Sequence, residues 1–168
     1  EVELHAPDTH ELAFFLNPGF TVESAFVANE SVKVHRNGSL LVLHTEKPLP
    51  KDQTVPVLME YRGGIRSTAL CEYVHATSHM ALPPFLFWYP FDFKSFSSVT
   101  AAVTLPEGMS VIAPPDAQDV LNREGSHTVS WQTRRPVCSM ALAAGRFEHA
   151  RRVYGNASYE VYWPSAHS

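Results

Sequence analysis

Cysteine is scarce in this chain, with only Cys71 and Cys138 among 168 residues. Two cysteines cannot make the disulfide framework with which small exported domains replace a large core. The pair is compatible with one bridge in an exported protein or with two unrelated buried thiols, and the second interpretation is favoured. The fold must therefore be held together by hydrophobic packing.

Positively charged residues are also few. Thirteen Lys and Arg residues against 17 Asp and Glu give a net charge of −4 and a pI near 6.1. A nucleic-acid-binding protein needs a clustered positive surface to neutralise phosphates, so no nucleic-acid partner is expected. A hydrophobic content of 45% excludes general disorder. The length suits one domain with a substantial core.

Long helical or apolar stretches are missing as well. Thirteen prolines and eight glycines interrupt the chain, which excludes a helix bundle or a coiled coil. The longest stretch without Asp, Glu, Lys or Arg is Tyr73 to Phe91, but it contains three prolines and two histidines. Lipid would leave its backbone polar groups unsatisfied, so no membrane span is expected in this chain. Glu1 opens the chain without Met or a secretory signal, and we expect an excised fragment of a longer protein.

The chain does have hydrophobic alternation with a period of two. Such alternation predicts strands with one buried and one solvated face. The segments that show it are 20–26, 55–62, 99–105, 128–132 and 159–163. Trp131 lies on the apolar phase of its segment and is expected to be buried.

Turn signals separate these segments. The dipeptide Asn37-Gly38, between apolar residues at 32–35 and 40–44, is a strong hairpin signal. About ten short strands at this spacing predict an all-β fold, an antiparallel β-sandwich or saddle-like sheet domain. The one expected helical turn is Asp116 to Leu121, after two prolines.

Catalytic motifs are missing. His10-Glu11 begins like the zinc-peptidase motif H-E-x-x-H, but Phe14 stands where the second histidine is required. His75 and His79 have the i, i+4 spacing that binds a metal on a helical face, but no carboxylate or thiol is obviously paired with them. Neither a G-x-S-x-G elbow nor a phosphate loop is present. The sequence predicts no catalytic residue, no metal site and no cofactor in this chain.

Aromatic residues gather in one short stretch: Phe85, Phe87, Trp88, Tyr89, Phe91, Phe93 and Phe96. Exposed, they would form a binding surface for sugar or peptide. If they are buried, they would form a core strand and the contact surface against a neighbouring domain. This interpretation is favoured because apolar runs beside prolines usually pack. Charge depletion with aromatic enrichment is typical of the centre of an interface. We therefore expect the Tyr73–Phe91 segment to be the functional face.

Several segments, read in order, resemble a known family. Residues 57–65, V-L-M-E-Y-R-G-G-I, resemble the "v-x-Y-x-G-x-i" strand end in the amino-terminal domain of aminopeptidase N-type zinc peptidases, the gluzincins. Residues 88–92, W-Y-P-F-D, and the strand at 99–105 are similar to that family's aromatic-Pro-x-x-Asp segment and its following strand. Residues 140–148, M-A-L-A-A-G-R-F-E, resemble its closing strand, and 159–164 resemble the strand that leads towards the catalytic domain.

This resemblance implies an amino-terminal β-domain at 1–150, from a divergent bacterial branch, followed at 151–168 by a strand and the start of a connection to a missing catalytic domain. It implies that the parent is a zinc aminopeptidase whose zinc lies in that catalytic domain. The partners are then the catalytic domain and, in the parent, a peptide substrate. The family's T-Q-x-E and F-P-C-x-D-E-P blocks are absent here, so its substrate-contacting Gln or Glu is not carried over.

The interface or substrate-cleft candidates are His75, His79, Phe85, Phe87, Trp88 and Tyr89. Two alternatives remain open. One is a stand-alone β-sandwich module that binds carbohydrate or protein, and the other is an inactive, peptidase-like interaction scaffold. The compartment stays open between the bacterial cytoplasm and a membrane-associated parent.

Overall fold

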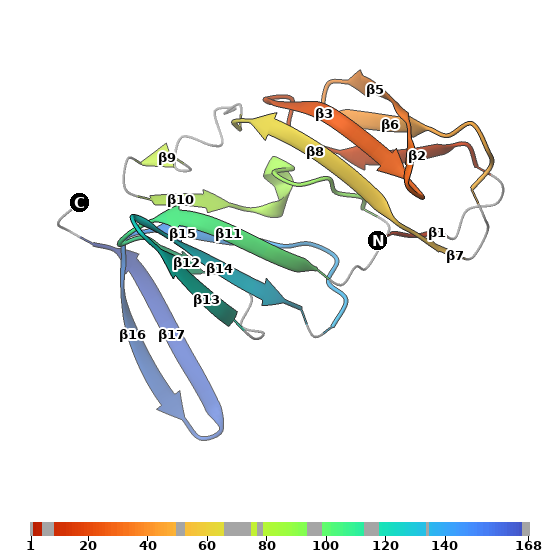
Figure 1. The fold of residues 1–168 in the computed structure, drawn as a ribbon. Coiled ribbons are helices and arrows are strands. Elements are labelled where there is room, and N and C mark those ends of the chain that lie inside the picture. Colours follow the sequence, from red (N-terminus) through yellow and green to blue (C-terminus); the bar gives the residue numbers. More distant parts are fainter. Residues whose placement is uncertain are drawn as a thin grey trace. The chain divides into compact units, whose positions relative to one another are not determined.

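Antiparallel strands provide nearly all the regular structure of the described part of the chain (Figure 1). The computed structural model describes residues 2–4, 9–49, 53–65, 75–76, 79–93, 99–112, 118–133 and 135–165. Within these residues the strands form six small sheets, and one short 3-10 helix lies between β10 (His79–Leu82) and β11 (Thr100–Pro106) in the sequence. The predicted all-β class is confirmed. The chain divides into two units, which are described one at a time.

The first unit comprises residues 1–67, 83–97 and 135–139. It contains two three-stranded sheets, with strand orders β2-β6-β5 and β4-β3-β8, and the pair β1-β7. The bounds are β1 Val2–Leu4, β2 Glu11–Phe15, β3 Phe20–Val27, β4 Glu30–Ser31, β5 Lys33–Asn37, β6 Leu40–His44, β7 Gln53–Val55, β8 Val57–Gly63 and the 3-10 helix η2 Pro84–Leu86.

The core of this unit forms where the apolar phases of its strands meet. Its buried members are Leu12, Phe14, Ala25, Val27, Leu43, Leu49 and Val55. The apolar run expected at 55–62 is divided into two strands with different neighbours. β7 ends at Val55 and pairs with β1, whereas β8 begins at Val57 and pairs with β3. Pro56 stands between them because it has no N–H to donate to a strand ladder.

The expected hairpin between β5 and β6 is confirmed, but its turn lies one residue later than predicted. Asn37 pairs with Leu40, so the two loop residues are Gly38 and Ser39. Gly38 has a φ of +60°, and glycine is favoured at the first central position of the type II′ turn that fits a right-twisted ribbon. Asn37 therefore ends the strand and does not enter the turn.

The second unit comprises residues 68–82, 98–134 and 140–168. It contains a four-stranded sheet of order β12-β15-β10-β9, a three-stranded sheet of order β11-β14-β13 and the hairpin β16-β17. The bounds are β9 His75–Ala76, β10 His79–Leu82, β11 Thr100–Pro106, β12 Ser110–Ile112, β13 Gln118–Arg123, β14 Ser126–Gln132, β15 Leu142–Gly145, β16 Phe147–Tyr154 and β17 Ala157–Pro164.

The helical turn expected at 116–121 is wrong for residues 118–121, and residues 116–117 lie outside the described part of the chain. These four residues belong to β13, which pairs continuously with β14 from Gln118 opposite Trp131 to Arg123 opposite Ser126. Pairing with β14 satisfies backbone N–H and C=O groups that a single helical turn would leave without hydrogen-bond partners. Trp131 is 2% exposed, which confirms its predicted burial.

Substitution of Gly63 tests the close approach of the backbone at the end of β8. It ends β8 with a φ of +141°, and a Cβ at this position would overlap the Gly19 carbonyl oxygen and lie 3.0 Å from the Phe20 Cα. Because backbone atoms cannot swing aside, Gly63→Ala should lower the free energy of unfolding by roughly 2–5 kcal/mol, combining backbone strain with overpacking.

The neighbouring Gly64 is the matched control, because a Cβ there would meet nothing within 4 Å. Gly64→Ala should be neutral or stabilising by up to about 1 kcal/mol, since alanine restricts the unfolded chain. Urea titration of the two variants measures both effects. Equal unfolding free energies for the two variants would contradict the close approach of the backbone at Gly63.

Candidate functional site

The aromatic stretch begins on a tight turn set by two prolines. Pro83 is extended, Pro84 opens η2, and the Leu86 and Phe87 amides donate to the Pro83 and Pro84 carbonyls at 3.1 and 2.9 Å. Proline suits the first position of a helical turn because its missing N–H would be unpaired there. Phe87 then ends the turn with a φ of +51°, an unfavourable region for a bulky residue.

Asn17 holds this turn in place. Its backbone amide donates to the Phe87 carbonyl at 2.8 Å, and its side-chain amide donates to the Leu86 carbonyl at 3.1 Å. Its side-chain oxygen accepts from the Gly19 amide at 3.0 Å. Asn17 is buried, so these bonds are shielded from water. One side chain therefore ties the strained Phe87 turn to the segment after β2.

A second attachment lies a few residues further along. Phe15 and Phe91 exchange two backbone hydrogen bonds of 2.7 and 2.9 Å, which makes the aromatic stretch an extra edge partner of β2. The Tyr61 hydroxyl donates to the Trp88 carbonyl at 3.4 Å. Burial raises the pKa of Tyr61 above its ordinary value, so this donor keeps its proton. The stretch is thus anchored near both ends and in its middle.

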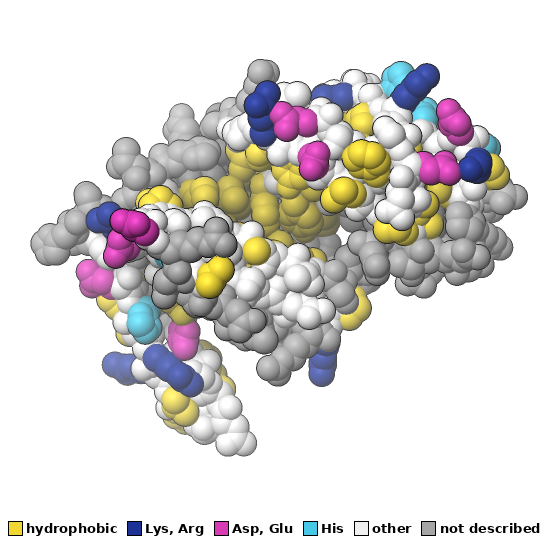
Figure 2. All heavy atoms as spheres, in the orientation of Figure 1, with side chains coloured by type: hydrophobic (Ala, Val, Ile, Leu, Met, Phe, Trp, Pro, Cys, Tyr) yellow, Lys and Arg dark blue, Asp and Glu magenta, His cyan; other side chains and the backbone are white. Residues whose placement is uncertain are grey.

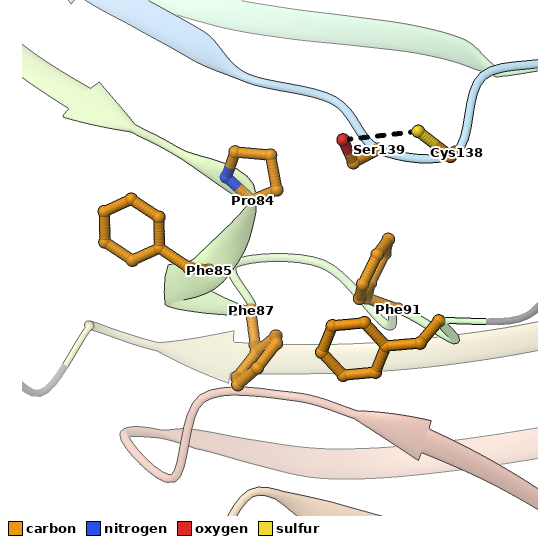
Figure 3. Close-up of a pocket in the computed structure, with 7 residues that line it drawn as sticks. Pro84, Phe85, Phe87, Phe91, Cys138 and Ser139 are labelled. Carbon is orange, nitrogen blue, oxygen red and sulfur yellow. Dashed lines mark hydrogen bonds between the residues drawn. The ribbon is translucent and has the colours of Figure 1, made fainter.

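These anchors shape an open pocket of about 440 Å³ within the first unit. Its lining is Pro84, Phe85, Phe87, Phe91, Phe93, Cys138 and Ser139. Figure 3 shows the 84–93 segment facing the 138–139 segment across this space. The Cys138 thiol lies 3.9 Å from the Ser139 hydroxyl, and no charged side chain belongs to the lining.

The phenylalanine rings meet mostly edge to face. Phe93 makes T-shaped contacts with Phe91 at 4.9 Å, with Phe15 at 5.1 Å and with Phe87 at 5.9 Å between ring centroids. This arrangement matches the preference set by the ring quadrupole. Phe91 is buried, whereas Phe85 and Phe93 are 64% and 68% exposed. The cluster therefore combines a packed interior with two solvent-facing rings.

The predicted site residues separate into two groups. Phe85 and Phe87 line the pocket. Trp88 and Tyr89 are half-buried beside it in sequence, with their rings in a T-shaped contact at 4.7 Å. The Trp88 ring N–H is buried and has no hydrogen-bond partner among the described residues.

His75 and His79 belong to the second unit, on the adjacent strands β9 and β10. His79 pairs with Ala76 and with Gly145, and its ring lies 6.5 Å from that of Phe147. The helical spacing of the two histidines is therefore not realised.

Sequence reasoning missed part of the pocket. Phe91 and Phe93 were visible in the aromatic cluster, but period and composition alone do not show which of its rings share one space. Cys138 and Ser139 come from a segment some fifty residues away, and no local signal linked them to it. Cys138 is a free, exposed thiol, so its expected burial is wrong, and Cys71 lies outside the described residues.

The β16-β17 hairpin is the other unusual surface. All of β17, and all of β16 except Phe147, are exposed. Figure 2 shows charged, histidine and hydrophobic side chains together over this hairpin. Opposed residues of an antiparallel pair share a face, so the register assigns every side chain of the hairpin to one of two faces.

One face of the hairpin has a polar network at its centre, although Phe147, Val153 and Pro164 also belong to this face. Arg151 donates to the Ser158 hydroxyl at 2.8 Å and lies 3.7 Å from the Glu160 carboxylate. The Tyr162 hydroxyl donates to Glu160 at 2.6 Å, and this hydrogen bond raises the pKa of Tyr162. The Tyr162 ring stacks on His149 with centroids 5.6 Å apart. These polar groups satisfy one another and suit water.

The other face is largely apolar. It carries six apolar or aromatic residues, Ala150, Tyr154, Ala157, Tyr159, Val161 and Trp163, and two charged ones, Glu148 opposite Trp163 and Arg152 opposite Tyr159. The Trp163 ring N–H donates to the Glu148 carboxylate at 3.2 Å. Val161 is 62% exposed, and each of the three aromatic residues is exposed as well. The alternation at 159–163 predicted one buried face, and this expectation is wrong for the described chain. The apolar phase is present, but the described residues supply nothing that covers it.

Metal ligands do not gather in the described part of the chain. No group of three or more His, Cys, Asp or Glu residues able to hold a metal ion occurs among these residues. They therefore offer no fit for a catalytic zinc. In the same residues, no helix has the length and hydrophobicity to cross a membrane.

No protein-family model and no curated protein matches this sequence. Solved structures do match. The crystal structure of an M1 zinc metallopeptidase from Deinococcus radiodurans aligns with a TM-score of 0.71 and 16% identity, over 92% of this chain and 39% of that chain. This chain has the fold of part of an M1 zinc metallopeptidase.

Two related structures agree with this result. A two-domain M1 zinc metallopeptidase variant bound to L-arginine gives a TM-score of 0.69 and 16% identity, with the same coverage. A variant bound to L-tryptophan gives 0.68 and 15% identity, over 92% of this chain and 40% of that one. The chain thus spans about two-fifths of the length of these M1 chains. The fold implied by the family resemblance is confirmed.

Substitution of Asn17 tests its role in holding the turn at Phe87. Asn17→Ala should lower the free energy of unfolding by about 1–3 kcal/mol, because it leaves buried hydrogen-bonding groups at Leu86 and Gly19 without their partner. It should also speed amide exchange at Phe87, whose backbone conformation Asn17 supports. Asn37→Ala, at an exposed asparagine of β5, should change both quantities little. An Asn17 variant as stable as the Asn37 variant would contradict the anchoring role.

Proposed function

We propose that this chain is the non-catalytic amino-terminal domain of an M1-type zinc metallopeptidase, packing on the catalytic domain and bordering its peptide cleft. The observation that carries the proposal is the structural match, which covers 92% of this chain but only 39% of the M1 chain. A domain that accounts for so little of its relative needs the remainder to complete the enzyme. The sequence segments that resemble the same family support this assignment independently of the structural match. They are residues 57–65, 88–92 with 99–105, 140–148 and 159–164.

The hairpin supplies the packing surface in this proposal. A two-stranded ribbon is marginally stable alone, and a sheet with one apolar face is normally covered by another layer. The apolar face of β16-β17 has the tyrosine and tryptophan side chains that are enriched at the centres of interfaces. We assign this face to the catalytic domain that follows in the same polypeptide, to which residues 151–168 lead.

The aromatic stretch is the candidate for the border of the cleft. Phe85, Phe87, Trp88 and Tyr89, with His75 and His79, remain the proposed contacts to the partner domain or the peptide. Two of the pocket phenylalanines are mostly exposed, and an aromatic surface without charge is typical of an interface centre. Zinc and the chemistry of peptide hydrolysis belong to the catalytic domain, and no step of that chemistry is assigned to residues of this chain.

The aromatic pocket also favours a second candidate, a stand-alone module that binds carbohydrate or protein. The complete gene distinguishes the two. An H-E-x-x-H motif followed by a downstream Glu supports the peptidase domain, whereas a stop codon near Ser168 supports the module. A longer gene without that motif would indicate an inactive, peptidase-like scaffold.

A matched pair of variants tests the packing surface. Val161 lies on the apolar face and Val153 on the polar face, and they are 62% and 67% exposed. In the isolated chain, Val161→Glu and Val153→Glu should each change the unfolding free energy by less than about 0.5 kcal/mol, as surface substitutions do.

In the protein encoded by the complete gene, Val161→Glu should destabilise by about 1–3 kcal/mol more than Val153→Glu, because it buries a carboxylate against the catalytic domain. Thermal and urea unfolding of both variants in both lengths measures the difference. Equal effects in the longer protein would rule out the apolar face as the packing surface.

A further inference from the structure

The pocket of the first unit has the properties of a ligand site in its own right. Its volume of about 440 Å³ falls within the roughly 300–1,000 Å³ of typical small-molecule sites, which are mostly apolar with a few polar groups. Four phenylalanines and one proline line it, and the thiol of Cys138 and the hydroxyl of Ser139 are its side-chain polar groups. The pocket thus has one apolar wall of rings and a small polar edge.

The aromatic wall of the pocket is held before any ligand arrives. The paired backbone bonds between Phe15 and Phe91 and the bonds from Asn17 to Leu86 and Phe87 all fix the 84–93 segment. Phe87 keeps a positive φ, a conformation that a bulky residue holds only where its surroundings enforce it, and such residues concentrate at functional sites. A preformed pocket binds with less loss of conformational entropy than one that must be ordered.

The open rings indicate the chemistry of the occupant. Phe85 and Phe93 both line the pocket and are both more than 60% exposed. Phe93 already meets three other rings edge to face, and a further planar ring would extend this herringbone arrangement against its free surface. A charged group would lose its hydration there without gaining an opposite charge.

We propose that this pocket binds an uncharged, planar aromatic group of about the size of indole. The ring lies against Phe85, Phe87 and Phe93, and a polar substituent reaches Ser139 at the edge. A free aromatic compound and the aromatic side chain of a polypeptide share this chemistry. The inference does not depend on the peptidase assignment, because it rests only on residues of the first unit.

Indole is the probe, and N-acetyl-L-tryptophanamide represents a side chain within a polypeptide. Indole-3-acetate tests charge, and cyclohexanemethanol tests aromaticity. Saturation-transfer NMR gives the dissociation constant of each. Alkylation of Cys138 by iodoacetamide, followed by mass spectrometry of the peptide that contains it, reports occupancy at the pocket edge.

Saturating indole should slow alkylation of Cys138 at least threefold, and both control probes should bind at least fivefold more weakly than indole. Phe85→Ala and Phe93→Ala should each weaken indole binding at least fivefold. Both side chains are largely exposed, so both variants should fold. Tyr154→Ala is the matched control, since Tyr154 is an exposed aromatic residue of the hairpin in the second unit, and it should leave indole affinity unchanged.

Binding of the amide at least as tight as that of indole assigns the pocket to a polypeptide side chain, and binding of indole alone assigns it to a free aromatic compound. Both results support the proposed ring chemistry. The proposal is overturned if indole fails to protect Cys138, if either control probe binds as well as indole, or if Phe85→Ala and Phe93→Ala leave affinity unchanged. A stop codon near Ser168 would remove the peptidase assignment and leave this test intact.

Discussion

The attachment of the aromatic stretch to the end of β2 is the interaction on which the candidate site depends. Phe15 and Phe91 exchange two backbone hydrogen bonds, and Asn17 binds the carbonyls of Leu86 and Phe87. Without these bonds, a proline-rich stretch between two strands would have no ladder to satisfy its backbone groups. With them, the stretch becomes an edge of the sheet, and its rings are presented in one fixed arrangement.

The second constraint is that the apolar face of a sheet is stable only when other apolar groups pack against it. The first unit meets it internally, because the apolar phases of β2, β3 and β6 converge on a shared core. The β16-β17 hairpin does not meet it within the described residues, whereas Arg151, Glu160 and Tyr162 on its polar face contact one another through an ion pair and a hydrogen bond. The chain therefore has one set of strands whose apolar residues are buried in a shared core and one hairpin whose apolar residues are exposed.

Local patterns in the sequence predicted much of the fold. The all-β class follows from the period of two, the β5-β6 hairpin from Asn37-Gly38, and the burial of Trp131 from its phase. The patterns failed where pairing decides the outcome. The segment at 118–121 is a strand because β14 lies beside it, and the turn at Ala28 and Asn29 has positive φ at both residues although alanine gives no turn signal. The pocket forms where residues 84–93 meet residues 138–139. Only the aromatic residues of the first segment formed a recognisable pattern in the sequence.

Amide hydrogen exchange along β16 and β17 tests the central claim most directly, that this chain is one domain of a larger peptidase and uses the hairpin to pack on its neighbour. Exchange would be compared between the isolated chain and the protein encoded by the complete gene. The account predicts that amides of residues 147–164 exchange quickly in the isolated chain and at least a hundredfold more slowly in the longer protein, while the first-unit core exchanges alike in both. Equal exchange of the hairpin in the two proteins would contradict it.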